Sequence, residues 1–226
     1  MRRVVPFLII AIVLLIASAA IWRLSRPGNS NTPNGATPHG SEPSGAVPPH
    51  VRGNAAAPVT VEEFADFQCG ACGAYYAELK KIETEFGERL KVIYRENPLY
   101  PTHEHSVIAA QAAEAAGLQS EAHFWAMHDK LFENQKAWVE AKDKDAVVAI
   151  FADYAKQIGL DTDRFMRDLS GEAVAQRILQ DGKRSHALGV GQTPTFFVNG
   201  KEAKGEQWKP DGLRQMINDA LREAGQ

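Results

Sequence analysis

The hydrophobic pattern of the chain begins with an uninterrupted apolar run from Val4 to Trp22, which follows two arginines. As a helix of about 1.5 Å per residue, the run would extend about 28 Å, close to the roughly 30 Å hydrocarbon core of a membrane. Ala17-Ser18-Ala19 also fits a signal-peptide cleavage site, although the run is longer than a usual signal segment. The pattern favours a membrane anchor over residues 1–24, with a signal peptide as the alternative. By the positive-inside rule, both interpretations export the rest of the chain.

The hydrophobic pattern then stops. Residues 25–56 contain almost no aromatic or large aliphatic side chains and are rich in Gly, Pro, Ser and Asn. A segment of this composition buries too little apolar surface to offset the entropy lost on ordering it. We therefore expect residues 25–56 to be a flexible linker that holds a folded domain away from the membrane.

Regular periodicity starts near Ala57 and continues to the C-terminus. The pattern predicts, in order, a strand (58–64), a helix (73–87), a strand (90–97), a helical block (about 103–188), a hairpin around Asn199-Gly200 and a final amphipathic helix (209–224). This order is typical of an α/β sandwich with helices inserted on one side. The sequence therefore predicts one α/β domain over residues 57–226, with the helical insertion at about 103–188.

Composition excludes one class of partner. The formal net charge of the 226 residues is −3 and 44% of them are hydrophobic. The hydrophobic content is enough for a sizeable core, whereas the charge offers no positive field for a polyanion. We therefore expect no nucleic-acid partner.

The two cysteines of the chain, Cys69 and Cys72, stand in the stretch "CGAC" between the first predicted strand and the first predicted helix. Unpaired N–H groups and the helix dipole stabilise a thiolate at a helix N-terminus, which is the position of Cys69. Cys72 follows one turn later, close enough to form a disulfide with Cys69. Thiol–disulfide exchange through a mixed disulfide at Cys69 requires this arrangement.

Two other interpretations of the cysteine pair are weaker. A purely structural disulfide with so short a loop removes little entropy from the unfolded chain. A zinc site needs about four ligands, and the sequence has no second C-x-x-C motif. The histidines are scattered, and we interpret four of them as packing or surface residues: His103, His105, His123 and His128. The pattern therefore favours redox chemistry over an inert pair or a metal site.

A second segment, "GVGQTPTFFVNG", supports the redox interpretation. It places Thr193-Pro194 directly before a predicted strand, and a proline there belongs at the first strand position or in a special turn, because it lacks an N–H donor. A cis bond at Pro194 would present the Thr193 backbone to an extended substrate near Cys69. We therefore predict Thr193 and Pro194 as substrate-binding residues.

Three stretches together resemble the DsbA-like thiol–disulfide oxidoreductases, in particular their membrane-anchored or secreted branch: "VEEFADFQCGAC", "HFWAMHDKLFENQ" and "GVGQTPTFFVNG". The resemblance covers nearly all of residues 57–226. It implies a thioredoxin fold with an inserted helical domain. It also implies that Cys69 is the nucleophile, Cys72 the resolving thiol and Pro194 a cis-proline. Glu63 matches an acidic position of the family, which implies a proton relay to Cys72; the alternative is a tolerated charge at a strand end.

The sequence departs from the strongly oxidising members of this family between the cysteines. Ala71 stands where those members have a histidine, and Gly70 replaces the commoner proline. A histidine at position 71 would help to hold Cys69 as a thiolate. Its absence leaves the direction of electron flow open.

These observations predict an exported enzyme that passes the Cys69–Cys72 disulfide to folding proteins of the cell envelope. A membrane reoxidase of the DsbB or VKOR type would regenerate the disulfide, and no bound cofactor is needed because the dithiol carries the electrons. One alternative is a membrane-tethered reductase or isomerase on the same fold. Another is a redox-sensing, chaperone-like binding module whose helical block offers an apolar groove, with Phe124, Trp125 and Trp138 as its lining.

Overall fold

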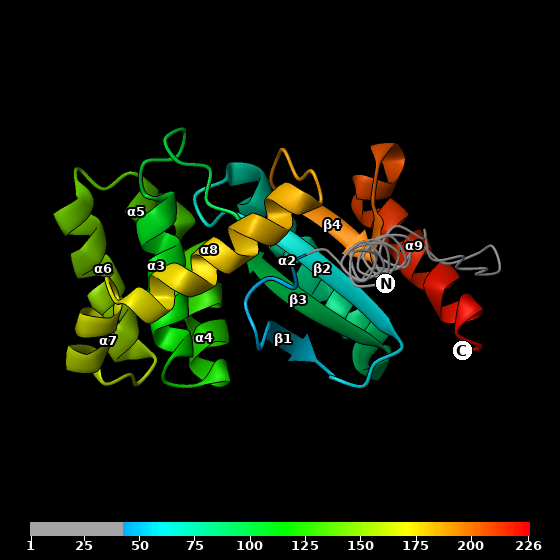
Figure 1. Cartoon of the computed structure of the whole chain (residues 1–226), viewed down its shortest axis with the longest axis horizontal. Helices are drawn as coiled ribbons and strands as arrows, with labels where there is room; N and C mark the ends of the chain where they lie inside the picture. Colours follow the sequence, from blue (N-terminus) through cyan, green and yellow to red (C-terminus); the bar gives the residue numbers. More distant parts are fainter. Residues whose placement is uncertain (1–42) are drawn as a thin grey trace, which may run out of the picture. The chain divides into compact units, whose positions relative to one another are not determined.

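The computed structural model describes residues 43–226, whose elements are drawn in Figure 1. In chain order they are β1 (His50–Gly53), β2 (Val59–Ala65), α2 (Gly70–Phe86), β3 (Leu90–Glu96), α3 (Ser106–Gly117), α4 (Glu121–Glu133), α5 (Gln135–Val139), α6 (Lys144–Gln157), α7 (Thr162–Asp168), α8 (Glu172–Ala187), β4 (Thr195–Val198), β5 (Lys201–Glu202) and α9 (Pro210–Glu223). The predicted anchor over residues 1–24 lies outside the described residues. Between residues 43 and 226, none of the helices has the length and hydropathy that a membrane crossing requires.

The centre of the described fold is a five-stranded sheet with the order β1-β3-β2-β4-β5. β2 and β3 are parallel, and the other neighbouring strands are antiparallel. β2 has a partner on each side and is buried along almost its whole length. The chain runs from the carboxyl end of β2 directly to Cys69, and this edge of an α/β sheet is where such folds place their ligands.

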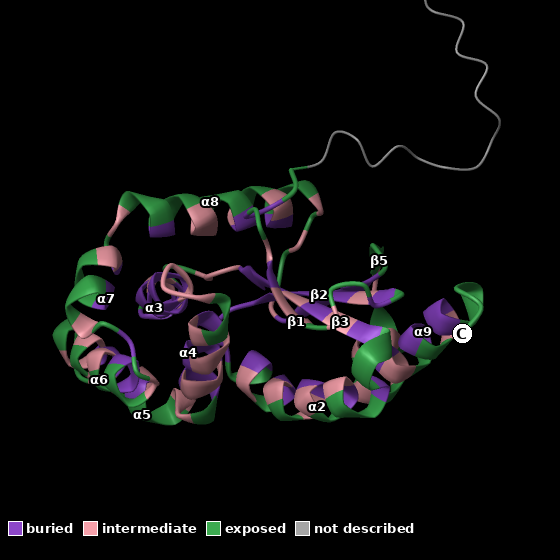
Figure 2. Ribbon diagram, turned by 90° about the horizontal axis from the view of Figure 1, so that it is seen from below, coloured by how far each residue is buried: buried purple, intermediate pink, exposed green. Residues whose placement is uncertain are grey.

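Helices cover both faces of this sheet, as Figure 2 shows. α2 and α9 pack on one face, where their apolar sides join the sheet in one hydrophobic cluster. In α9, Leu213, Ile217 and Leu221 recur at helical spacing and are buried, which gives this helix its amphipathic pattern. α8 lies along the other face and continues over the helical insertion (Figure 2).

The helical insertion, α3 to α8, spans residues 106–187, and its hydrophobic cluster extends to Phe67, Tyr94 and the two cysteines. Its central helix, α3, is buried on nearly all sides because it packs against α4, α6, α7 and α8. The small alanine side chains of α3 allow these helices to approach closely. The alternative prediction of an apolar groove is wrong at two of its three residues, since Phe124 and Trp138 are completely buried. Trp125 is half-buried beneath the guanidinium of Arg52, which lies 4.2 Å from its ring centre.

The boundary between linker and domain differs from the prediction. β1 lies within residues 25–56, so the prediction of a flexible linker is wrong for residues 43–56. This segment contains few apolar residues, and polar bonds hold it: Arg95 donates to the carbonyl oxygens of Ser44 and Ala46, each at 3.0 Å. Asp181 of α8 accepts from the Ala46 N–H at 2.7 Å. These partners lie far away in the sequence, which is why local composition did not predict them.

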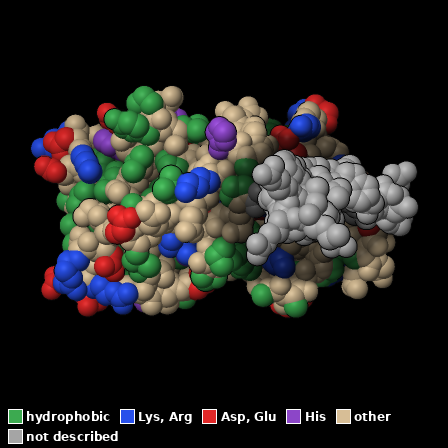
Figure 3. Space-filling view, viewed as in Figure 1, with side chains coloured by type: hydrophobic (Ala, Val, Ile, Leu, Met, Phe, Trp, Pro, Cys, Tyr) green, Lys and Arg blue, Asp and Glu red, His purple; other side chains and the backbone are tan. Residues whose placement is uncertain are grey.

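The surface carries both signs of charge. On the face drawn in Figure 3, lysine and arginine side chains are interspersed with aspartate and glutamate over the helical insertion. Interspersed charges of this kind create no extended field of one sign.

Candidate active site

The two cysteines occupy the start of α2. Cys69 is the N-cap residue with extended backbone angles (φ −67°, ψ 120°), and its N–H donates to the Asp66 carbonyl at 3.0 Å. Both cysteines are free thiols. Cys69 is 8% exposed and Cys72 is completely buried. A reactant from solvent therefore meets the sulfur of Cys69 first.

The environment separates the acidities of the two thiols. The hydrogen bond from the Cys72 thiol is the largest influence on Cys69 and, against the opposing effect of burial, lowers the pKa of Cys69 to about 5. The backbone N–H groups of Cys72 and Ala71 point to the same sulfur and add to this effect. Burial raises the pKa of Cys72 far above its ordinary value, and the hydrogen bond to Cys69 raises it further. Cys69 is therefore the thiolate of the reduced pair at neutral pH, and Cys72 stays protonated.

The loop before β4 lies against the nucleophile. The Thr193–Pro194 peptide bond is cis, and the Cys69 sulfur lies 3.4 Å from the Thr193 carbonyl oxygen, to which it donates only when it is protonated. The Thr193 hydroxyl is buried without another hydrogen-bond partner and is placed to donate to the Cys69 thiolate, which lowers the pKa of Cys69 further. Trp208 fixes this loop because its ring N–H donates to the Pro194 carbonyl at 3.0 Å. The structure thus brings together Cys69, Cys72, Thr193 and Pro194, which lie up to 125 positions apart in sequence.

Glu63 lies below this site on β2 and is 3% exposed. Its carboxyl group makes no hydrogen bond to any residue between 43 and 226. Burial, and then the charge of Glu83, raises the pKa of Glu63 to about 8, although Arg52 opposes this shift. The charge of Glu63 in turn raises the pKa of Cys72, so the two groups interact electrostatically. The position is compatible with the predicted proton relay between Glu63 and Cys72.

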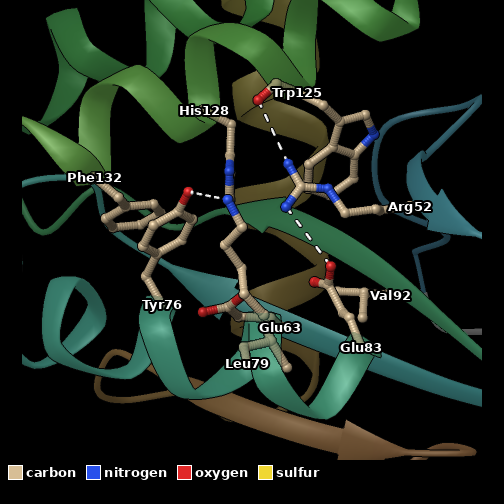
Figure 4. A pocket seen from close by; sticks show the side chains of 10 residues that line it. Arg52, Glu63, Tyr76, Leu79, Glu83, Val92, Trp125, His128 and Phe132 are labelled. Atoms are coloured by element: carbon tan, nitrogen blue, oxygen red, sulfur yellow. Dashed lines mark hydrogen bonds and ion pairs between the residues drawn. The ribbon is translucent and has the colours of Figure 1, made fainter. Parts of the chain in front are cut away.

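A small pocket adjoins the Glu63 carboxyl group, as Figure 4 shows. Its volume is about 10 Å³, which is the space that a single water molecule needs. Arg52 lies between Glu83, at 3.7 Å, and the Trp125 carbonyl, at 3.5 Å (Figure 4). His128 also lines the pocket, and burial lowers its pKa to about 4. The pocket offers room for a water molecule beside a neutral carboxyl group and a neutral imidazole.

The sequence did not single out the residues that shape the loop between β2 and α2. The buried carboxylate of Asp66 accepts three hydrogen bonds: from the Gln68 N–H at 2.8 Å, the Leu99 N–H at 2.8 Å and the His103 ring at 2.7 Å. Gln135 reaches the same loop from α5. Asp66 stands in the stretch quoted above and Gln135 ends another, but local sequence does not reveal which backbone groups they meet.

The described residues hold no metal-ligand cluster. Within residues 43–226, no three side chains of His, Cys, Asp or Glu lie close enough together to hold a metal ion. Among the scattered histidines, His103 bonds to Asp66 and His128 is buried in the Glu63 pocket, while His105 is buried at the start of α3.

Comparison with known proteins places this geometry in a family. Residues 46–219 match the family model described as "Thioredoxin". Among curated proteins, the chain is similar to the Na(+)/H(+) antiporter NhaA 1 of Salinispora arenicola, with 39% identity over 156 residues. That match covers 69% of this chain and 22% of the antiporter. The chain therefore spans about a fifth of the length of this relative, and the antiporter name belongs to the whole of that longer protein.

Two solved structures extend the comparison. Oxidised BdbD from Bacillus subtilis is 27% identical with a TM-score of 0.68, over 77% of this chain and 93% of that one. The thiol–disulfide exchange protein α-DsbA2 from Wolbachia pipientis is 23% identical with a TM-score of 0.61, over 75% of this chain and 85% of that one. The predicted α/β class, the thioredoxin fold with helical insertion and the resemblance to DsbA-like oxidoreductases are thereby confirmed.

Proposed function

This chain belongs to the thioredoxin family, and we propose that it is a thiol–disulfide oxidoreductase of the cell envelope that donates its Cys69–Cys72 disulfide to exported proteins. One observation carries the proposal. The Cys69 sulfur, with a pKa lowered to about 5, lies 3.4 Å from the carbonyl of Thr193, above a buried, protonated Cys72. A substrate thiol and a substrate backbone can meet this site together.

The reaction begins with the oxidised pair. A substrate thiolate attacks the Cys69 sulfur, the Cys69–Cys72 bond breaks, and its electron pair leaves with Cys72. Glu63 gives the Cys72 thiolate a proton, because burial makes the charged sulfur of Cys72 unfavourable, and its carboxylate takes up a new proton from water in the adjacent pocket. A second substrate thiolate then attacks the substrate sulfur of the mixed disulfide. Cys69 leaves as a thiolate, the substrate gains a disulfide, and two electrons remain in the reduced pair.

The same geometry supports the oxidising direction. A stabilised Cys69 thiolate favours the reduced form of the pair, and an enzyme whose reduced form is favoured is a strong disulfide donor. Ala71 removes one family source of thiolate stabilisation. The Cys72 thiol, the Thr193 hydroxyl and two backbone N–H groups supply others at the same sulfur.

The sequence and the fold support the proposed location and partners. The N-terminal apolar run supports an extracytoplasmic domain that is membrane-anchored rather than free. An unfolded substrate would lie with extended backbone against the half-buried Thr193, beside Cys69. Regeneration of the disulfide requires an oxidant, which we assign to a membrane quinone-linked protein of the DsbB or VKOR type.

The reduction potential of the pair tests the direction. The full-length protein is equilibrated with glutathione buffers, and its free thiols are trapped by alkylation. A potential of about −120 mV supports a disulfide donor, whereas a potential of about −270 mV would show that the protein is a tethered reductase instead. In parallel, a Cys69→Ser variant is compared with the parent for oxidation of a reduced, unfolded protein. Equal rates would refute the role of Cys69.

A further inference from the structure

We propose that Gln135 is a positioning residue, which ties the loop before Cys69 to the helical insertion and thereby keeps the Cys69 sulfur aligned with the N–H groups at the start of α2. The inference rests on the proposed role of Cys69 as the nucleophile. It assigns part of the control of that nucleophile to a side chain of the inserted domain, 66 positions further along the chain.

The contact is a double one. The Gln135 side-chain amide donates to the Phe67 carbonyl at 2.7 Å and to the Cys69 carbonyl at 2.9 Å. One amide nitrogen has two hydrogens, so both of its donors are used by the backbone of this loop. Gln135 is half-buried. Gln135 of α5 therefore fixes the orientation of the Phe67 and Cys69 carbonyl groups.

The insertion holds Gln135 firmly. Gln135 is the first residue of the short helix α5, which Trp138 attaches to the core of the insertion. The Trp138 ring is completely buried, and its N–H donates to the Leu131 carbonyl at 2.8 Å. A buried aromatic ring with a satisfied N–H leaves little freedom to the backbone that carries it. Gln135 thus acts from a rigid support.

The carbonyl of Cys69 connects this contact to the sulfur. That oxygen also accepts the Gly73 N–H at 3.0 Å, the first hydrogen bond of α2. The N–H groups of Ala71 and Cys72, which point to the Cys69 sulfur, belong to this same turn. If the Cys69 peptide rotates, the sulfur and these N–H groups no longer face one another.

Gly73 shows how closely the Gln135 amide packs against α2. A Cβ atom at position 73 would overlap the Gln135 Oε1 atom, so any larger residue would displace the Gln135 amide. Glycine inside a helix destabilises the helix relative to alanine. The need to seat Gln135 explains why α2 has a glycine at this position.

Two single variants and their combination test the inference. Gln135→Leu removes both donors while it keeps a similar volume, and Gly73→Ala displaces the amide without altering it. For each reduced protein, the Cys69 thiolate is titrated by its ultraviolet absorbance, and the exchange equilibrium with glutathione is measured. We expect each single variant to raise the pKa of Cys69 and to reduce the equilibrium constant for disulfide donation about tenfold, which is about 30 mV.

The double variant separates this mechanism from a general loss of packing. If Gly73→Ala acts through Gln135, it has no further effect on the Cys69 pKa in the Gln135→Leu background, so the two effects are not additive. The control is Gly182→Ala in α8, where a Cβ meets nothing within 4 Å; it should leave the Cys69 pKa unchanged. Full additivity of the two effects would overturn the inference.

The outcomes distinguish this inference from the proposed function. A parent protein whose Cys69 has an ordinary thiol pKa would overturn both. A parent with a lowered Cys69 pKa that Gln135→Leu leaves unchanged would overturn the positioning role alone. If Gln135→Leu fails to fold, Gly73→Ala decides, because the gain in helix propensity favours its folding while the amide is still displaced.

Discussion

Replacement of Glu63 by glutamine should make the protein more stable although it impairs exchange. Glu63 is buried, makes no hydrogen bond within residues 43–226, and has a pKa raised to about 8, first by burial and then by Glu83. Folding therefore requires a proton on this carboxyl group at neutral pH. Glutamine has the shape of the protonated form and carries no charge, so the variant no longer needs that proton.

The magnitude follows from the two pKa values. The carboxyl group has an ordinary pKa of 4.5 in the unfolded chain and about 8 in the folded protein. At pH 7, which is about 2.5 units above the unfolded pKa, protonating the carboxyl group on folding costs about 1.4 kcal/mol for each unit. We therefore expect Glu63→Gln to raise the free energy of unfolding by about 3 kcal/mol. Because the folded pKa is the raised one, the gain is absent below about pH 4.5, grows with pH and levels off above about pH 8.

Thermal and urea unfolding of the reduced proteins measure this gain. For a domain of this size, about 3 kcal/mol raises the unfolding midpoint by about 6–12 °C. The matched control is the neighbouring Glu62→Gln. Burial raises the pKa of Glu62, but hydrogen bonds from Arg184 and Arg95, each at 2.7 Å, outweigh this effect and lower it. Removing that charge breaks the ion pairs of Glu62 with Arg95 and Arg184 and should destabilise the protein by about 3 kcal/mol.

The two adjacent variants should thus shift stability in opposite directions. A Glu63→Gln protein that is no more stable than the parent at pH 7, or whose gain is the same at pH 5 as at pH 8, would refute the argument from burial. The proton relay is tested separately: we expect the variant to release Cys72 more slowly from the oxidised pair, measured as a lower rate of substrate oxidation.

Three further predictions concern the loop and the cysteines. Because the pKa of Cys69 is lowered to about 5, reduction of the disulfide should take up two protons below about pH 5 and one proton above it. The reduction potential should therefore fall by about 60 mV per pH unit below about pH 5 and by about 30 mV per pH unit above it. A single slope from about pH 4 to 8 would contradict the lowered pKa of Cys69. In Cys72→Ala, the Cys69 thiolate should attack a protein that already contains a disulfide and, without a resolving thiol, remain joined to it as a mixed disulfide, visible on a non-reducing gel and absent in Cys69→Ser/Cys72→Ala. Asp66→Ala removes the acceptor of three hydrogen bonds and should lower the free energy of unfolding by about 2–4 kcal/mol, and a change below about 0.5 kcal/mol would show that the loop does not depend on this carboxylate.

The cysteine pair and its surroundings differ in how far sequence predicts them. Cys69 and Cys72 could be assigned to the start of a helix because strand, motif and helix follow one another along the chain. Thr193-Pro194 could be recognised by its position before a strand, but its contact with Cys69 depends on β4 pairing with β2, which is a long-range event. Only the three-dimensional structure supplies the 3.4 Å distance between Cys69 Sγ and the Thr193 carbonyl.

Other features escaped prediction for physical reasons. β1 has four residues and pairs with β3 about 40 positions away, and polar contacts rather than apolar burial hold the segment before it. The prediction of a linker relied on the low content of apolar residues, which does not reveal polar contacts with distant residues. The alanine-rich stretch predicted a helix at α3, but not that Glu114 on this helix would be completely buried. Such placements depend on which distant helices pack together, and a local pattern does not contain that information.

The short strands at the two edges of the sheet have a consequence for a protein proposed to handle unfolded chains. An exposed sheet edge is a template on which an extended polypeptide can add a further strand and aggregate. Here one edge, β5, has two residues, and the other, β1, has four. The Val51 N–H in β1 donates to the Glu121 carboxylate at 2.8 Å. An unfolded client thus finds little free backbone at either edge, and it can be released from the Thr193 loop without having been incorporated into the sheet.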